Sequence, residues 1–216
     1  MFWTGEDRLG IFGIGGCSRE IACLAIDILG SIEKAKKKIF FIKKDDEDSD
    51  SCIWDIPVIR EGDIKTNDTL FSLGIGNSLL RSQIASRLNK DICFANLKHP
   101  NAIISPFMRI GEGAVLCAGV VVTCDVSIGK HAQLNRSSNI GHDCRIGDFF
   151  SLAPGGVISG RCTLGDRIQF GANASIREEL EIVSDTIIGM GAMIVKSITN
   201  KGIYIGNPAK ILVKSI

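Results

Sequence analysis

The feature that most constrains the fold of this chain is an apolar side chain that recurs at every sixth position from Ile104 to Ile194. A period of six fits neither an α-helix nor ordinary strands, which lose their phase in the turns between them. A hexapeptide repeat is typical of a solenoid and predicts a parallel β-helix. The series has no miss, so no long loop is expected within it. Its members are Ile104, Ile110, Leu116, Val122, Ile128, Leu134, Ile140, Ile146, Leu152, Ile158, Leu164, Phe170, Ile176, Ile182, Ile188 and Ile194.

A second position in each hexapeptide, four residues after the first, also carries small or apolar side chains such as Ala114 and Cys144. We expect both positions to point into the solenoid. Glycine follows the apolar residue at intervals of eighteen residues, which predicts three hexapeptides per coil and about five coils. We interpret these glycines as corners that need an unusual backbone angle. They are Gly111, Gly129, Gly147 and Gly165. The repeat does not reveal its hand, and general topology rules favour right-handed crossovers.

The residues before the repeat alternate between strand-like and helix-like segments. The apolar run at 9–15 predicts a buried strand and a tight turn, and 18–29 has apolar residues at helical spacing before Gly30. Further strands are expected at 39–42, 69–75 and 92–95, a helix at 78–88 and a charged loop at 43–50. This alternation predicts a parallel α/β sheet. Because His99-Pro100 suits a boundary, we expect an α/β domain at 1–98, a β-helix at 99–198 and a C-terminal cap at 199–216.

Composition argues against several classes of protein. The 25 basic and 24 acidic residues leave a net charge of +1, which does not favour nucleic-acid binding. No apolar run reaches the roughly 18 residues of a membrane span, and the charged N-terminus is not typical of a secretory signal, so we expect a cytoplasmic protein without membrane insertion. The eight cysteines have no C-x-x-C spacing. We expect them to be reduced, with a disulfide or zinc framework as the alternative.

Several segments together carry a resemblance to a known family. They are Phe12-Gly-Ile-Gly-Gly-Cys-Ser-Arg-Glu20, Gly74-Ile-Gly-Asn77 with Arg81, His99-Pro100, Asn135-Arg-Ser-Ser-Asn-Ile-Gly-His-Asp-Cys-Arg-Ile-Gly-Asp148 and Ile205-Gly-Asn-Pro-Ala-Lys210. Through them the chain resembles hexapeptide-repeat sugar acyltransferases with an N-terminal Rossmann-like domain, which include sialic acid O-acetyltransferases and N-acetyltransferases of nucleotide-linked amino sugars in bacterial glycan pathways. The resemblance implies a left-handed β-helix and a homotrimer with active sites between subunits. It also implies acetyl-CoA along the β-helix and a sugar nucleotide on the N-terminal domain.

His142 is the candidate general base. It lies two positions after the inward-facing Ile140, so the register predicts a side chain that points out of the coil. Acetyl transfer from a thioester needs a base that takes a proton as the nucleophile attacks. The resemblance assigns this role to His142 and support of its imidazole to Asp143, and it places Asn135 against the acceptor sugar. Without the resemblance, a solvated histidine, a charged corner residue and a turn asparagine are the plain alternatives.

The resemblance also assigns contacts with acetyl-CoA, mostly through the main chain. Backbone N–H groups of neighbouring coils would stabilise the thioester oxygen. Ser151 stands where some family members have a second histidine that bonds acetyl-CoA, and its hydroxyl would make a shorter version of that contact. The other assigned positions are Gly160, Ala172, Met190 and Pro208.

The turn Gly13-Ile-Gly-Gly16 follows a predicted strand and opens a predicted helix, which suits phosphate binding by backbone N–H groups. It is shorter than the dinucleotide fingerprint, and Lys43 and Lys44 stand where an NAD enzyme would have an acid. We therefore expect a sugar nucleotide, with its base unassigned, and not hydride transfer. Ordinary packing of an α/β domain is the alternative. The expected binding residues are Gly13, Gly15, Gly16, Cys17, Lys43, Lys44, Gly76 and Asn77.

The expected function is transfer of an acetyl group from acetyl-CoA to the amino group of a nucleotide-linked amino sugar by direct attack, without an acyl-enzyme. O-acetylation of sialic acid or a related nonulosonic acid is the nearest alternative, because it uses the same base. A zinc enzyme of the β-helix type needs three histidines. The chain has only His99, His131 and His142, and His99 belongs to the junction, so no metal is expected. A non-catalytic scaffold is the remaining alternative.

Overall fold

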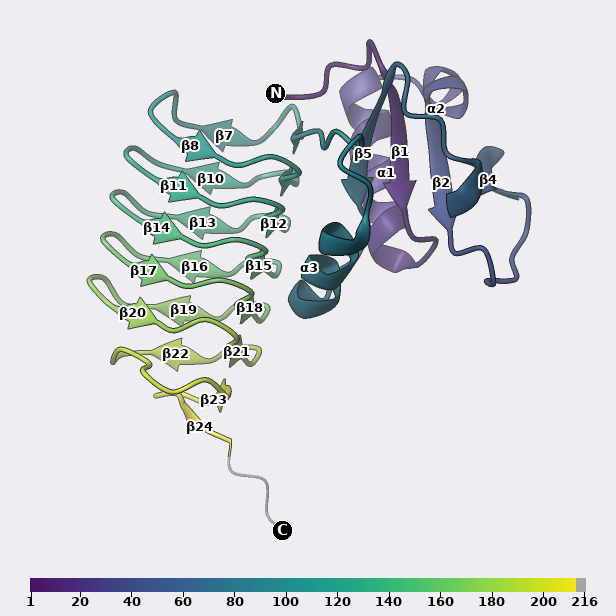
Figure 1. The fold of residues 1–216 in the computed structure, drawn as a ribbon. Coiled ribbons are helices and arrows are strands. Elements are labelled where there is room, and N and C mark those ends of the chain that lie inside the picture. Colours follow the sequence, from purple (N-terminus) through teal and green to yellow (C-terminus); the bar gives the residue numbers. More distant parts are fainter. Residues whose placement is uncertain (213–216) are drawn as a thin grey trace.

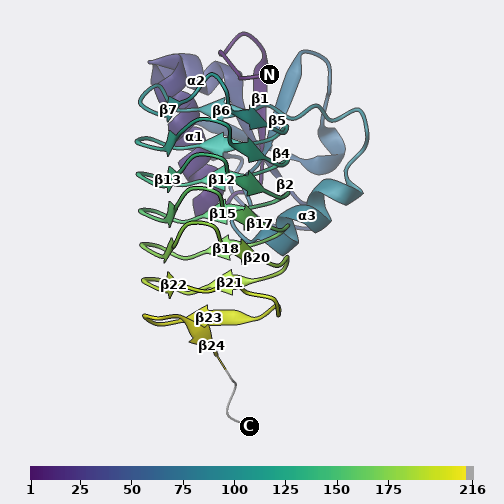
Figure 2. The ribbon, with the colours of Figure 1, turned by 90° about the vertical axis from the view of Figure 1, so that its left-hand side faces the viewer.

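The computed structural model describes residues 1–212. They form an α/β unit and, beside it, a column of stacked coils (Figure 1). The α/β unit lies beside the first coils, and the last coils extend beyond it. Figure 2 shows the coils as nearly parallel layers, with the described C-terminal residues at the end of the column.

The α/β unit contains one five-stranded sheet in the order β3-β4-β2-β1-β5. All pairs are parallel except the antiparallel pair β3–β4. The strands are β1 (Arg8–Phe12), β2 (Ile39–Lys43), β3 (Cys52–Ile53), β4 (Ile56–Arg60) and β5 (Thr69–Leu73), and the helices are α1 (Gly16–Leu29), α2 (Ile32–Lys38), the 3-10 turn η1 (Glu61–Asp63) and α3 (Ser78–Arg87). The predicted parallel sheet is therefore present.

Local sequence explains where these elements end. Helix α1 ends at Leu29 and is capped by Gly30, whose φ of 61° is left-handed, as the predicted stop requires. Helix α2 was not predicted, because its charged residues hide any apolar period and only Ala35 is buried. The strand predicted at 92–95 is wrong. The segment forms a single bridge, Phe71↔Phe94, because the chain then leaves the sheet to begin the coils at β6 (Leu97–Lys98).

The coils follow the hexapeptide register throughout. All sixteen apolar positions are the second residue of a two-residue strand, and each strand pairs in parallel with the strand eighteen residues away, for example Ile140 with Ile158. Three hexapeptides therefore make one coil of a left-handed β-helix, as predicted. The strands are β7 (Ile103–Ile104), β8 (Arg109–Ile110), β9 (Val115–Leu116), β10 (Val121–Val122), β11 (Ser127–Ile128), β12 (Gln133–Leu134), β13 (Asn139–Ile140), β14 (Arg145–Ile146), β15 (Ser151–Leu152), β16 (Val157–Ile158), β17 (Thr163–Leu164), β18 (Gln169–Phe170), β19 (Ser175–Ile176), β20 (Glu181–Ile182), β21 (Ile187–Ile188) and β22 (Met193–Ile194).

The interpretation of the repeated glycines as corners of unusual backbone angle is wrong. Gly111, Gly129, Gly147 and Gly165 do not have positive φ. A Cβ added at Gly129 would lie 2.7 Å from the carbonyl carbon of Gly147 in the next coil, so the glycines are needed for close stacking of coils. The left-handed position comes two residues later in the hexapeptide and is occupied by residues such as His131, Asp143 and Arg167.

The β-helix has three flat faces, which we call face 1 (β7 to β22 in steps of three), face 2 (β8 to β20 in steps of three) and face 3 (β6 to β21 in steps of three, then β23 and β24). Face 3 packs against the α/β unit, whose core includes the face 3 residues Leu97 and Val115 together with Leu24 of α1. Face 2 presents exposed polar side chains. Face 1 presents the outward residues Ile103, Val121, Asn139, Val157, Ser175 and Met193.

The predicted cap begins with a change of register. Strand β23 (Ile203–Ile205) still pairs in parallel with β21, and β24 (Lys210–Ile211) then folds back antiparallel to β23. The end of the column is thereby closed by a hairpin instead of a further coil. Residues 213–216 of the predicted cap lie outside the described residues.

Candidate active site

His142 lies at the corner between face 1 and face 2, in the turn from β13 to β14. Its side chain is about half exposed, so it points out of the coil as the register predicts. His142 Nδ1 lies 2.7 Å from Asp143 Oδ2. Asp143 has a φ of 59°, the left-handed position of the hexapeptide turn, and this turn brings its carboxylate back to the ring.

Gly160 lies one coil further along the same corner and leaves the space that the imidazole uses. A Cβ added at Gly160 would lie 2.7 Å from His142 Nε2 and 2.8 Å from its Cε1. Within residues 1–212, Nε2 has no hydrogen-bond partner. The corner therefore presents an imidazole whose one nitrogen is held by a carboxylate and whose other nitrogen is open.

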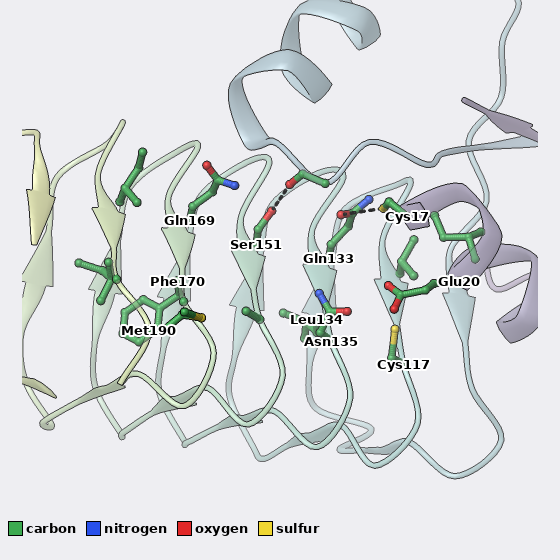
Figure 3. A pocket seen from close by; sticks show the side chains of 18 residues that line it. Cys17, Glu20, Cys117, Gln133, Leu134, Asn135, Ser151, Gln169, Phe170 and Met190 are labelled. Atoms are coloured by element: carbon green, nitrogen blue, oxygen red, sulfur yellow. Dashed lines mark hydrogen bonds between the residues drawn. The ribbon is translucent and has the colours of Figure 1, made fainter. Parts of the chain in front are cut away.

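A first cleft, of about 440 Å³, lies between helix α1 and face 3 (Figure 3). Asn135 belongs to it and lies in the turn from β12 to β13, at the corner between face 3 and face 1. In Figure 3, Gln133, Ser151 and Gln169 form a row along face 3, with Cys17 and Glu20 of α1 beside the first coils and Met190 beside a later one. His142 does not line this cleft. In one chain, the two corners are separated by the width of face 1.

A second cleft, of about 570 Å³, lies in the α/β unit at the ends of β1, β2 and β5. Seven of the eight residues predicted to bind the nucleotide line it. The exception is Lys43, whose Nζ donates to the carbonyl oxygen of Ser49. The seven are Gly13, Gly15, Gly16, Cys17, Lys44, Gly76 and Asn77.

Only the first glycine of the glycine-rich turn is closely packed against other atoms. Gly13 has a φ of 100°, and a Cβ there would lie 2.7 Å from Ser18 Oγ. Gly15, Gly16 and Gly76 have nothing within 4 Å of an added Cβ. Gly15 precedes α1 without a side-chain cap, and α1 has no acidic residue in its first turn. The N–H groups at this helix end are thus available to an anion.

The two clefts share Cys17 and Gly76. Cys17 stands at the start of α1, and its Sγ lies 3.7 Å from Gln133 Oε1 on face 3. Burial raises the pKa of the Cys17 thiol, so the group is protonated and uncharged at neutral pH. A ligand that begins in the cleft of the α/β unit can therefore continue past Cys17 and Gly76 onto the β-helix.

Arg81 has a structural role that the sequence did not predict. In the sequence it appeared only among the residues that carry the family resemblance. Its side chain is 1% exposed and donates to main-chain oxygens on both sides of the junction, including those of Ile75, His131 and Phe149. It also donates to Gln133 Oε1 and Ser151 Oγ. Burial lowers the pKa of Arg81 to about 10. This guanidinium ties α3 and the Gly76 loop to the coils.

The predicted contacts with acetyl-CoA are distributed over several places. Met190 lines the first cleft and is 80% exposed, and Ala172 follows Gly171 at the same corner. Ser151 also lines this cleft, but its hydroxyl already accepts from Arg81 Nη2 at 2.8 Å. Pro208 lines a separate cavity of about 270 Å³ at the end of the column.

Asn77, which lines the second cleft, also has a structural contact. Asn77 Oδ1 accepts from Leu80 N at 2.9 Å and caps the start of α3. The same side chain lines the cleft and caps the helix, so the capping bond fixes the position of the Asn77 amide in the cleft.

Residues 1–212 contain no group of three or more histidine, cysteine, aspartate or glutamate residues arranged to hold a metal ion. All eight cysteines are free thiols. Among the described residues no helix is long and apolar enough to cross a membrane.

Comparisons with known proteins agree with this architecture. No protein-family model matches the chain. The structure of WeeI from Acinetobacter baumannii AYE is 30% identical, with a TM-score of 0.86, and the match covers 95% of this chain and 99% of that one. The acetyltransferase domain of PglB from Neisseria gonorrhoeae FA1090, solved in complex with acetyl coenzyme A, is 27% identical, with a TM-score of 0.84 over 96% of this chain and 100% of that one.

A curated relative, GDP-perosamine N-acetyltransferase of Escherichia coli O157:H7, is 32% identical over 131 residues, which cover 60% of this chain and 56% of that protein. The chain spans about half the length of the curated relatives it matches first. The match to WeeI extends over both the α/β unit and the coils. Together with the unbroken hexapeptide register, these similarities show that the chain belongs to the hexapeptide-repeat sugar N-acyltransferases.

Proposed function

We propose that this protein transfers the acetyl group of acetyl-CoA to the amino group of a nucleotide-linked amino sugar in the synthesis of a bacterial surface glycan. The observation that carries the proposal is the imidazole of His142, held at Nδ1 by Asp143 and open at Nε2. The relatives support the donor and the acceptor class, because one is solved with acetyl coenzyme A and another is an N-acetyltransferase of GDP-perosamine.

In the proposed mechanism His142 is a general base. Donation of its Nδ1–H to Asp143 leaves a lone pair on Nε2. The amine of the acceptor attacks the thioester carbonyl carbon and Nε2 takes the proton that the amine loses. The tetrahedral intermediate then collapses, the C–S bond breaks, and the CoA thiolate leaves with the proton that the imidazolium of His142 returns. No acyl-enzyme forms, and the products are the N-acetyl sugar and CoA.

Free main-chain donors support acetyl-CoA binding at the assigned turns. The N–H groups of Gly160, Ala172 and Met190 make no backbone hydrogen bond within residues 1–212. Each is the turn residue before a left-handed position. Ala172 and Met190 repeat this donor on successive coils at the corner between face 3 and face 1, whereas Gly160 lies at the corner of His142. We assign these groups to the amides and the thioester oxygen of acetyl-CoA. Ser151 and Pro208 are assigned further contacts along the ligand.

We assign the sugar nucleotide to the second cleft, with the α/β unit at 1–98 as a Rossmann-like domain. Its parallel strands lie in the order third, second, first, fourth in the chain, which matches the first four strands of the dinucleotide-binding order 3-2-1-4-5-6. The diphosphate would lie at the N-terminus of α1, with Lys44 nearby. The sugar would pass Cys17 and Gly76 toward Asn135 in the first cleft. The β-helix domain at 99–198 and the cap at 199–216 complete the proposed division.

We further propose that the working form is a homotrimer. His142 and Asn135 occupy opposite corners of face 1, so a site that uses both needs a second copy of the chain. Face 1 is suited to the interface, because four of its six outward residues are apolar. Three of these four, Ile103, Val157 and Met193, are 68%, 38% and 41% exposed. A threefold axis facing face 1 brings the His142 corner of one subunit to the Asn135 corner of the next. A cytoplasmic location is proposed because the eight free thiols suit a reducing compartment.

The test is release of CoA by the purified protein with acetyl-CoA and a panel of amino-sugar nucleotides. Each amino sugar is paired with the matching hydroxy sugar, which separates N- from O-acetylation. We expect CoA release with at least one amino sugar and a loss of about 100- to 10,000-fold in kcat for His142→Ala. Activity confined to hydroxy sugars or to free sialic acid would contradict N-transfer. Full activity of His142→Ala would contradict the assigned base.

A further inference from the structure

Helix α3 lines the second cleft along its whole length, and this gives the cleft two distinct ends. The residues of α3 and its cap that face the cleft are Asn77, Leu80, Gln83, Ile84 and Arg87, which recur at helical spacing and therefore share one face. Ten residues of helix rise about 15 Å. The Asn77 end adjoins Gly76 and the coils, whereas the Arg87 end is remote from them.

The direction of a sugar nucleotide in this cleft follows from the reaction. On the proposed function, the sugar must reach the first cleft through Cys17 and Gly76, and the diphosphate lies at the N-terminus of α1 beside them. The nucleoside must then extend toward the Arg87 end. The separation of about 15 Å is sufficient for a ribose and a base beyond the diphosphate.

The Arg87 end is rich in carboxylate acceptors. Arg87 forms a two-pronged ion pair with Glu61, in which Nη2 lies 2.8 Å from Oε2. The loop that carries Glu47 lies beside Glu61, because Gly62 N donates to Asp45 Oδ1 at 3.0 Å. Glu47 itself has one longer contact, in which it accepts from Lys44 N at 3.4 Å. Gln83 makes no side-chain hydrogen bond within residues 1–212. A carboxylate has about four lone-pair positions, so both glutamates keep capacity to accept hydrogen bonds from a ligand.

Apolar side chains are also available for the flat faces of a base. Ile42, Leu80 and Ile84 line the same cleft. Leu80 is 46% exposed although it lies on the face of α3 that borders the cleft. A planar ring that slides between these side chains would remove apolar surface from water while its edge remains free to meet the polar groups.

The chemistry of this end distinguishes between nucleobases. The Watson–Crick edge of guanine offers the N1–H and the two N2–H donors to carboxylates, and Arg is a good partner for its O6. The edge of uracil or thymine offers one N–H between two carbonyl oxygens, and both oxygens would face carboxylate charge. Two glutamates and one arginine therefore suit guanine better than uracil or thymine.

We infer that the Arg87 end of the second cleft is a guanine subsite, in which Glu61 and Glu47 accept from the N1–H and N2–H groups and Arg87 donates to O6. This inference rests on the proposed function for the direction of the ligand and names the nucleotide class of its acceptor. It gives Glu47 and Glu61 a role in substrate specificity apart from the acetyl transfer itself.

The test is the affinity of the purified full chain for GDP, UDP, dTDP and CDP by isothermal titration. We expect GDP to bind at least 10-fold more tightly than UDP or dTDP. Glu47→Gln and Glu61→Gln should each weaken GDP binding on the order of 10-fold, because a good bidentate contact discriminates by about that much or more. They should leave UDP binding within about twofold. Glu33→Gln in α2, outside the cleft, is the matched control and should change neither.

Two outcomes would overturn the guanine subsite. One is equal or tighter binding of UDP or dTDP. The other is an equal loss of all four nucleotides in Glu47→Gln, which is free of the Arg87 ion pair and so tests the base contact without breaking that pair. Acetylation of a UDP- or dTDP-linked amino sugar without GDP binding would refute the subsite and leave the acetyltransferase proposal standing. Tight GDP binding without acetylation of any amino sugar would support the guanine subsite and contradict the acetyltransferase proposal.

Discussion

Three neighbouring residues, each with a different role, position the imidazole of His142. Ile140 anchors the turn in the core, Asp143 occupies its left-handed position and holds the imidazole, and Gly160 of the next coil leaves room for the ring. The repeating backbone of the coil therefore positions the base without any dedicated loop.

Gly160→Ala is expected to reduce kcat/KM at least 10-fold with little change in thermal stability. Its Cβ would lie 2.7 Å from His142 Nε2, and the exposed imidazole can swing away at small energetic cost. Gly160 does not have a positive φ, so alanine adds no backbone strain. Steady-state kinetics and a thermal melt of the same preparation check both parts. An unchanged kcat/KM would show that the ring does not need this space.

His131 is a buried histidine that should make stability depend on pH. It is 4% exposed and packs between Phe94 and Phe149. Burial lowers the pKa of His131 from 6.5 to about 4. Between pH 4 and pH 6.5 His131 is therefore protonated in the unfolded chain and neutral in the folded chain. Its contribution to stability is complete above pH 6.5 and is lost as the pH falls toward 4, by at most about 3 kcal/mol.

The variant His131→Asn should lose this contribution to the pH dependence. Asparagine tolerates the left-handed φ of 54° at this position, so the comparison is not dominated by backbone strain. The measurement is urea unfolding of both proteins at several pH values between 4 and 7. The difference in unfolding free energy should shrink as the pH falls. Parallel curves over this range would contradict the prediction.

At the scale of elements, α3 is fastened to the coils by the buried Arg81, which has no carboxylate partner within residues 1–212. Its donors are used by main-chain oxygens, by Gln133 and by Ser151. A planar guanidinium can satisfy acceptors on several elements at once, which a lysine ammonium does less well. The wall shared by the two clefts depends on this attachment.

Arg81→Met is therefore expected to destabilise the protein on the order of 3 kcal/mol, because several buried acceptors lose their donors. The free energy of urea unfolding measures this. Arg136→Met is the matched control. Arg136 pairs with Glu20 across the same junction, but both side chains are about half exposed, so the loss should stay below about 1 kcal/mol. Equal losses in the two variants would contradict a special role for Arg81.

At the scale of the whole molecule, the three faces of the β-helix have different surroundings. The first coils of face 3 are covered by the α/β unit, and face 2 carries exposed polar residues such as Arg109, Arg145 and Glu181. Face 1 carries exposed apolar outward residues from its first coil to its last, from Ile103 to Met193, whereas the exposed Ile187 of face 3 lines the first cleft. It also separates the two corners that the proposed site must combine.

Val157→Glu on face 1 should convert the proposed trimer to monomers and reduce activity at least 100-fold, because it places a charge in an apolar interface. Light scattering and CoA release measure the two effects. Thr163→Glu, one hexapeptide later on face 2, is the matched control and should remain trimeric and active. A wild-type monomer, or a trimeric and active Val157→Glu variant, would contradict the assembly.

Much of this molecule follows from local pattern. The register from Ile104 to Ile194 predicted the strands, the size of the coil and the outward direction of His142, because each depends only on neighbours within a few residues. The strand expected at 92–95 and the reason given for Gly129 were wrong. Both depend on which distant segment packs alongside, and no local period carries that information.

The sequence alone determined the β-helix, the parallel α/β unit and the family, since periodicity and short motifs are local properties of the chain. Tertiary structure decided which residues meet. It placed Asn135 and His142 at different corners, joined the two clefts at Cys17 and Gly76, buried Arg81 among main-chain oxygens and brought Glu61 to Arg87. Such contacts arise when packed elements bring remote residues into the same space, and their free energy is gained only in the folded chain.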